Sequence, residues 1–167
     1  MNLIEPMIAE LQHEAATTKR LLERVPQESL AWQPHAKSMT LGRLSAHIAN
    51  LPGMLVGVFD GDELDSNDLK SQSPPEADLS SILKTFDEKI AGALELLKTQ
   101  PDERFLLASW RYVSGEKLIF EMPRLAVIRF VILNHLVHHR GQLSVYLRLL
   151  DVPLASVYGP TADEQLF

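Results

Sequence analysis

The chain has 167 residues, of which 46% are hydrophobic and 23% charged, proportions typical of a folded domain with one substantial core. Its formal net charge of -6, with no dense run of Lys or Arg, argues against a protein that binds nucleic acid through phosphate contacts. The absence of cysteine excludes disulfides, thiolate metal ligands and a cysteine nucleophile, and it fits a reducing compartment, so we expect a single cytoplasmic domain over residues 1–167.

The first segment has the spacing of an amphipathic helix. Apolar residues recur every three or four positions from Ile4 to Val25, which predicts a helix that ends near Pro26. The amino-terminal residues include acids where a signal peptide carries basic residues, and no apolar run reaches the roughly 20 residues of a membrane helix. We therefore expect neither a targeting segment nor a membrane partner.

A second helix is predicted after a loop. Ser38 and Thr40 offer a side-chain oxygen for its N-cap, and apolar positions with helical spacing run through residues 41–55. Pro52 lies inside this run and should kink the helix, because proline lacks the backbone N–H and crowds the preceding turn.

A polar connection precedes the third helix. Residues 60–78 are acidic, rich in turn formers and nearly devoid of apolar side chains, so we interpret them as a solvated connection. Asp78 is then expected to cap a third helix, whose apolar face follows residues 79–97.

The last predicted elements are a hairpin and a long helix. Aromatic and β-branched residues flank the pair Ser114-Gly115, which predicts a short β-hairpin. Pro123 suits the first turn of a fourth helix that should run to about Leu150. The expected fold is therefore all-α, a four-helix bundle with a short β-hairpin inserted before the last long helix.

Histidines occupy the face of the last helix that should be buried. Residues four apart differ by about 40° around a helix axis and residues seven apart by about 20°, so His135, His139, Gln142 and Tyr146 form one row that points into the bundle. Polar side chains in such a place cost free energy unless they find partners. A divalent metal would be such a partner, because His-x-x-x-His on a helix holds two imidazoles within reach of one ion.

A third ligand can come from the second helix. His47 lies at the edge of its apolar face, and three imidazoles would leave coordination positions open to water or substrate, as in catalytic zinc sites. The same spacing also fits ordinary core histidines, satisfied without a metal. His138, three residues after His135, could replace His139 as a ligand, or face solvent or a partner subunit.

Two segments resemble a known protein family. NHLVHHRGQLSVYLRLLDVPLASVYGPTADE, residues 134–164, is similar to the carboxy-terminal signature of the DinB/YfiT-like superfamily, DNA-damage-inducible four-helix proteins unrelated to the DNA polymerase of the same name. WQPHAKSMTLGRLSAHIANLP, residues 32–52, resembles the second-helix signature of that family. The resemblance extends over essentially the whole chain.

The resemblance implies a metal triad of His47, His135 and His139 and leaves His138 as a neighbour or surface residue. Gln142 and Tyr146 are candidates to line the pocket or orient the ligands, with core packing as the alternative for Tyr146. The resemblance further implies an up-up-down-down bundle, a homodimer, and zinc or nickel in the site. Iron and manganese also suit three histidines.

For activity, the resemblance implies a small-molecule substrate. The reaction classes are S-transfer or isomerisation with a low-molecular-weight thiol such as bacillithiol or mycothiol, and metal-dependent hydrolysis. The alternative is a non-catalytic metal-binding module of a stress or DNA-damage response.

Overall fold

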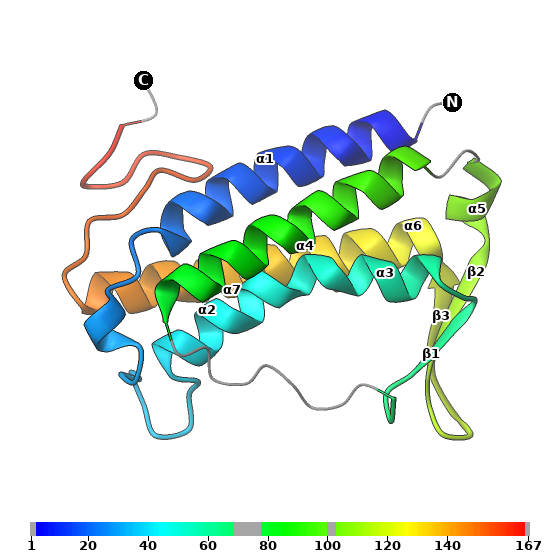
Figure 1. The fold of residues 1–167 in the computed structure, drawn as a ribbon, viewed down its shortest axis with the longest axis horizontal. Coiled ribbons are helices and arrows are strands. Elements are labelled where there is room, and N and C mark those ends of the chain that lie inside the picture. The colour runs from blue at the N-terminus through cyan, green and yellow to red at the C-terminus, as the bar shows by residue number, and fades with distance from the viewer. Residues whose placement is uncertain (1–2, 69–77, 100–102, 166–167) are drawn as a thin grey trace.

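The computed structural model describes residues 3–68, 78–99 and 103–165. Four long helical segments lie side by side and a small three-stranded sheet covers one end of them (Figure 1). The predicted helices and the predicted hairpin before the last helix are confirmed. In chain order the helical segments are α1 (Ile4–Leu22), α2 (Leu41–Asn50) with α3 (Met54–Phe59), α4 (Leu79–Thr99), and α6 (Arg124–Ala126) continuing into α7 (Asn134–Leu149).

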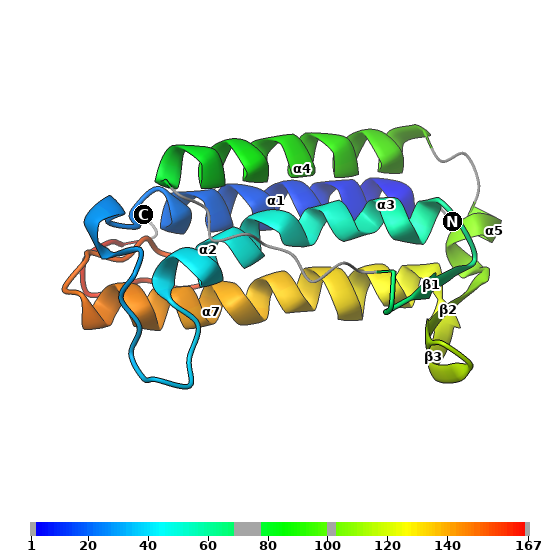
Figure 2. The same cartoon turned by 60° about the horizontal axis from the view of Figure 1, so that its bottom comes forward.

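The four segments do not run in the order that the family resemblance implied. Figures 1 and 2 show that α1 and α6–α7 run in one direction, and α2–α3 and α4 in the other. The order along the chain is thus up-down-down-up and replaces the expected up-up-down-down. Helix α3 and helix α4 are parallel neighbours in chain order, so a long connection must join them, and residues 60–78 supply that length. Amphipathic spacing shows which face of a helix is buried but carries no information on its direction.

Helix α2 begins and is interrupted where the sequence predicts. The backbone N–H of Arg43 donates to Oγ1 of Thr40 at 3.2 Å, which makes Thr40 the N-cap. The 3₁₀ turn η2 (Leu51–Gly53) contains Pro52 and separates α2 from α3. A second 3₁₀ turn, η1 (Gln27–Ser29), lies in the loop before α2.

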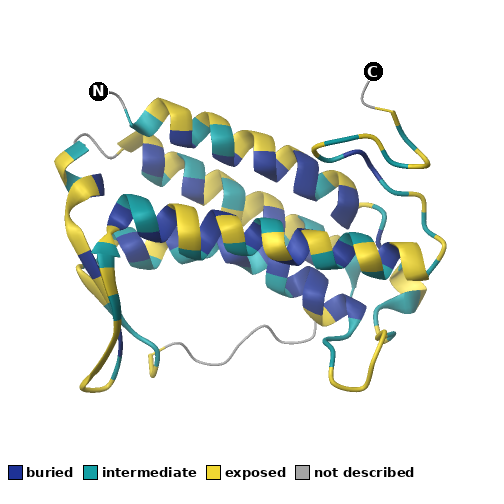
Figure 3. Cartoon of the chain, turned by 180° about the vertical axis from the view of Figure 1, so that it is seen from behind, coloured by how far each residue is buried: buried dark blue, intermediate teal, exposed yellow. Residues whose placement is uncertain are grey.

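The helices bury their inner faces in two apolar clusters, and along each helix dark blue buried bands alternate with exposed ones (Figure 3). One cluster joins α1, α2, α4 and α7, and the other lies nearer the sheet. Asp78 caps α4 as predicted, since its Oδ1 accepts from the N–H of Ser81 at 2.8 Å. In the described part of the chain, no helix combines the length and the apolar character that a membrane crossing requires.

The sheet contains one strand that the sequence did not predict. Strand β2 (Ser109–Ser114) pairs antiparallel with β3 (Lys117–Pro123), and Gly115 turns the hairpin with a φ of 59°. Strand β1 (Glu63–Asp65) pairs with β2 in parallel. The interpretation of residues 60–78 as solvated connection was therefore wrong for β1, because three residues that include two acids give no alternating apolar pattern.

A buried arginine holds the sheet against the bundle. Arg124, 3% exposed, donates to the backbone carbonyls of Val58 at 3.0 Å and Gly61 at 2.8 Å, and it forms an ion pair with Asp62. Arg124 directly follows β3 in the sequence. Its contacts therefore fix the end of α3 relative to the hairpin. The short helix α5 (Glu103–Leu107) precedes the hairpin.

The last helix is not a regular α-helix over its whole length. Its segment η3 (Val127–Leu133) is π-helical, and α7 begins directly after it. The sequence predicts a continuous α-helix here, because the apolar positions keep helical spacing. π-Helical turns inside longer helices are rare, and those that occur are often found at functional sites. This one ends two residues before His135.

Candidate metal site

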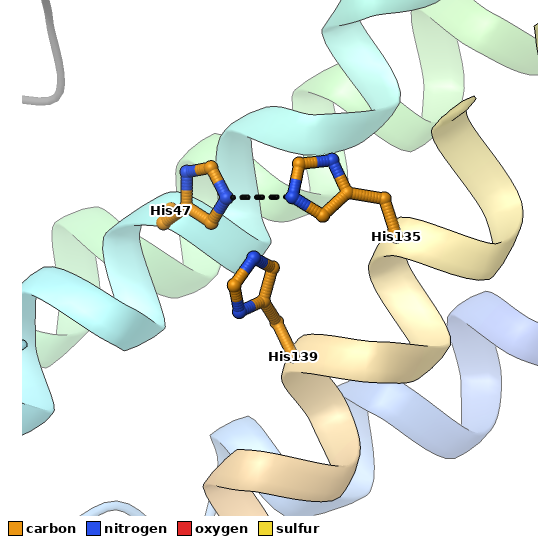
Figure 4. A group of neighbouring side chains, drawn as sticks. All are labelled: His47, His135 and His139. Atoms are coloured by element: carbon orange, nitrogen blue, oxygen red, sulfur yellow. Dashed lines mark hydrogen bonds between the residues drawn. The ribbon is translucent and has the colours of Figure 1, made fainter.

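Three histidines from two helices meet inside the bundle. His47 comes from the last turn of α2, while His135 and His139 lie one turn apart on α7 (Figure 4). The Nε2 atoms of His47 and His135 are 3.3 Å apart, and the three ring centroids lie 4.5 to 5.1 Å from one another. Each residue offers one ligand atom, and these atoms all lie within 4.8 Å of each other. The cluster could therefore hold a metal ion.

The separation of the nitrogens suits a small divalent cation. Two nitrogens bound to a tetrahedral zinc at their usual bond length are about 3.4 Å apart, close to the 3.3 Å between His47 and His135. Among the described residues the group consists of histidines alone, without a carboxylate or a fourth member. Three neutral ligands would leave at least one coordination position free.

Gln142 fixes the orientation of one of the rings. The Nδ1 atom of His139 lies 2.7 Å from the amide oxygen of Gln142, one turn further along α7. Because that oxygen only accepts, Nδ1 must carry the proton, which leaves the lone pair on Nε2 free for the cluster. The sequence indicated Gln142 as a candidate to line the pocket or to orient a ligand, and this contact suits the second role.

Burial keeps these histidines neutral. It lowers the pKa of His47 to about 4, with help from His139, His135 and Arg43. The pKa of His135 is also lowered, first by burial and then by His139 and His138, and burial lowers the pKa of His139 against the opposing effect of Gln142. Since only a neutral imidazole has a lone pair to share, the environment favours the protonation state that binds metal.

The structure separates the remaining predicted residues from the cluster. His138 is exposed, and its ring packs against His139 with a centroid distance of 4.8 Å without belonging to the group. Tyr146 donates to the carbonyl of Met39 at 3.2 Å and meets the ring of Trp32 edge to face. Tyr146 thus packs the loop before α2 against α7.

A cavity beside the site was not predicted. About 210 Å³ lies between α3, the sheet and the last helix, and His135 forms part of its lining. Three aromatic residues of the hairpin wall it, Trp110, Tyr112 and Phe120. The available signal was their spacing, because residues two apart on a strand share a face and Tyr112 pairs with Phe120 in the register. In the sequence these residues predicted only a hairpin.

Comparison with known proteins gives consistent matches. A family model described as the DinB family matches residues 2–165. The chain is 26% identical over 158 residues to the uncharacterized protein YrdA of Bacillus subtilis (strain 168), covering 92% of this chain and 86% of YrdA.

Two crystal structures share the fold. The DinB-like protein YjoA of Bacillus subtilis has a TM-score of 0.68 at 21% identity, covering 98% of this chain and 99% of that one. A DinB-like protein from Bacillus cereus ATCC 10987 has a TM-score of 0.66 at 24% identity, covering 88% and 92%. None of these descriptions states a reaction.

Proposed function

Because the chain belongs to the DinB family, and because three histidines converge inside its bundle, we propose that it is a metal-dependent enzyme with His47, His135 and His139 as ligands. The observation that carries the proposal is the meeting of three imidazoles, whose pKa values burial lowers toward the neutral, metal-binding form. The proposed reaction is S-transfer with a low-molecular-weight thiol of the bacillithiol or mycothiol kind, or hydrolysis of a small molecule.

The metal ion, Gln142 and an external thiol have separate roles in this proposal. A divalent ion held by the three imidazoles would supply Lewis acidity that makes a water or a small thiol nucleophilic near neutral pH. Gln142 holds the proton on Nδ1 of His139 and so directs Nε2 toward the cluster. The chain contains no cysteine, so a thiol used in the reaction would have to come from outside the protein.

The ligand set supports zinc or nickel as the metal. Imidazole nitrogens suit zinc, nickel and iron, whereas manganese, magnesium and calcium prefer oxygen ligands.

Metal analysis of protein purified without a polyhistidine tag tests the site. We expect about one divalent ion per chain, lost in His47→Ala and in His139→Ala. His138→Ala is the matched control, since it removes an imidazole from the same turn of α7 but not from the group. Metal content that is unchanged in His47→Ala, or absent from the unaltered protein after loading with zinc and with nickel, would refute the proposal.

A second candidate is a non-catalytic metal-binding module in a stress response. The observation that favours it is the absence of a carboxylate base from the group in the described part of the chain. A transfer assay with a panel of thiols and electrophiles separates the two functions. Turnover that requires metal and is lost in His135→Ala, with the circular dichroism spectrum unchanged, supports the enzyme. A homodimer, which the family resemblance implied, is part of the proposal, and sedimentation velocity at micromolar concentration tests it.

A further inference from the structure

The cavity beside His135 has the character of a binding pocket for an apolar group. Helix α3 and strand β1 form one wall, the hairpin the second and the segment η3 the third. Its volume is about 210 Å³. The lining residues are Met54, Val58, Leu64, Trp110, Tyr112, Phe120, Val127, Val131, Ile132 and His135.

The size and the walls indicate what would fit. A cavity of about 150 Å³ accommodates benzene, so this one has room for a ring and a few further atoms. Trp110 and Tyr112 stack with ring centroids 6.4 Å apart, and Tyr112 and Phe120 lie 5.3 Å apart, which offers aromatic faces and edges to a guest. No side chain with a formal charge lines the pocket in the part of the chain that the structure describes. An ionised group would therefore lose its hydration there without compensation.

The cavity also connects to the histidine cluster through a shared residue. His135 lines the cavity, and its Nε2 lies 3.3 Å from that of His47. The π-helical segment η3 supplies three of the lining residues, Val127, Val131 and Ile132, and ends two residues before His135. A molecule in the cavity is therefore adjacent to the proposed metal ligands.

We propose that this pocket binds the uncharged part of the substrate, an aromatic ring or a branched alkyl group, and directs its reactive group to the histidine cluster. The direction of the reactive group to the histidine cluster rests on the proposed function, whereas the binding of the uncharged part does not. The thiol, which in the bacillithiol and mycothiol kind is polar, would approach from outside this pocket.

Two chelators with and without a ring test the pocket. Benzohydroxamic acid and acetohydroxamic acid share the metal-binding group and differ in a phenyl against a methyl group. On zinc-loaded protein, isothermal titration calorimetry should show at least tenfold tighter binding of the phenyl compound. In a Trp32→Phe background Trp110 is the remaining tryptophan, and only the phenyl compound should change its fluorescence.

Variants locate the effect. Val131→Phe fills the cavity and should reduce the preference for the phenyl compound to less than twofold, as should Met54→Trp if Val131→Phe fails to fold by circular dichroism. Val145→Phe adds the same ring at an exposed position of α7 and should keep the preference. Equal affinities of the two compounds for the unaltered protein, or a preference that survives both obstructions in folded protein, would overturn the pocket.

The metal-free protein separates failure of the pocket from failure of the metal site. Toluene should bind to metal-free protein and change the fluorescence of Trp110 in the Trp32→Phe background, and Val131→Phe should abolish this binding. If zinc does not bind but toluene does, the proposed function fails and the pocket stands. If zinc binds but neither toluene nor benzohydroxamic acid binds in preference to its ring-free counterpart, the pocket fails alone.

Discussion

The Nε2 atoms of His47 and His135 lie 3.3 Å apart, although 88 residues separate the two histidines in the chain. At this distance one neutral ring donates to the other, or both nitrogens face a cation. A metal that replaces this single hydrogen bond would join α2 to α7 through three coordinate bonds, one to His47 and two to His135 and His139. The contact therefore places the site where a bound ion stabilises the fold.

We predict that divalent metal raises the thermal stability of the protein. Ligand at a hundred times its Kd stabilises a folded protein by about 2.7 kcal/mol, provided that it does not bind the unfolded chain. Differential scanning calorimetry with zinc, and with a chelator instead, should show a higher melting temperature with zinc. His47→Ala is the control and should show little shift, whereas an equal shift in His47→Ala would indicate binding elsewhere.

The metal-free protein should lose stability in mild acid. An unfolded histidine titrates near 6.5, whereas burial lowers the pKa of His47 to about 4 and lowers the pKa values of His135 and His139. Between about pH 6.5 and pH 4 the unfolded chain thus binds protons that the folded chain does not, so the free energy of unfolding falls as the pH falls through this window. Urea denaturation at intervals from pH 7.5 to pH 4 measures the slope. His47→Gln should make it shallower, and an unchanged slope would contradict the prediction.

Gln142→Leu should weaken metal binding without unfolding the protein. The substitution removes the acceptor that holds the proton on Nδ1 of His139. Loss of such a contact usually lowers metal affinity by about 10- to 100-fold. Competition with a fluorescent zinc chelator gives the affinity. Gln142→Glu keeps an acceptor at this position and should bind metal far better than Gln142→Leu. Equal affinities in both variants would show that Gln142 does not orient the ring.

A buried ion pair behind the site should be important for stability. Arg140, which follows His139, is 2% exposed and lies 2.6 Å from Glu14 of α1, and the hydroxyl of Tyr158 donates to the same carboxylate at 2.8 Å. Glu14→Gln would leave a buried guanidinium without its counter-charge and should cost about 3–5 kcal/mol in urea denaturation.

The surface pair of Arg129 and Glu10 is the matched control for this loss. It also joins the last helix to α1, but Arg129 is half exposed, so Glu10→Gln should change the free energy of unfolding by less than about 1 kcal/mol. The double replacement Glu14→Leu with Arg140→Met should recover much of what Glu14→Gln loses. Equal losses from the buried and the exposed pair would refute this account.

Much of the site could be predicted from the sequence because it depends on helical periodicity. His135 and His139 share a face at any position of a regular helix, and the buried stripe of α7 shows which face it is. Spacing did not choose between His138 and His139, since both fit a pair with His135. That choice depends on how α7 rotates against α2, which is a tertiary relationship, and the family resemblance supplied it.

Three features could not be predicted because they depend on contacts between elements that are far apart in the chain. They are the direction of the helices, the strand β1 and the cavity. Leu64 lies in a three-residue strand whose partner, β2, is more than 40 residues away, so no local pattern marks it. Trp110 and Phe120 were identified as hairpin residues, but the space that they wall exists only because α3 and η3 lie opposite. Pockets arise from the packing of elements, and single-sequence patterns describe the elements one at a time.

The π-helical turn in η3 has a consequence for how proteins of this architecture can diverge. A π-helical hydrogen bond closes on residue i+5 instead of i+4, so an α-helical version of the segment would need one residue less. Removing that residue would convert the segment to an α-helical turn, and the hairpin before it and His135 after it would keep nearly the same relative orientation. The same deletion in an α-helical stretch would instead rotate everything that precedes it by about 100° about the helix axis relative to His135. The π-helical segment is thus a place where this helix can gain or lose a residue without turning the aromatic walls of the cavity away from the histidine cluster.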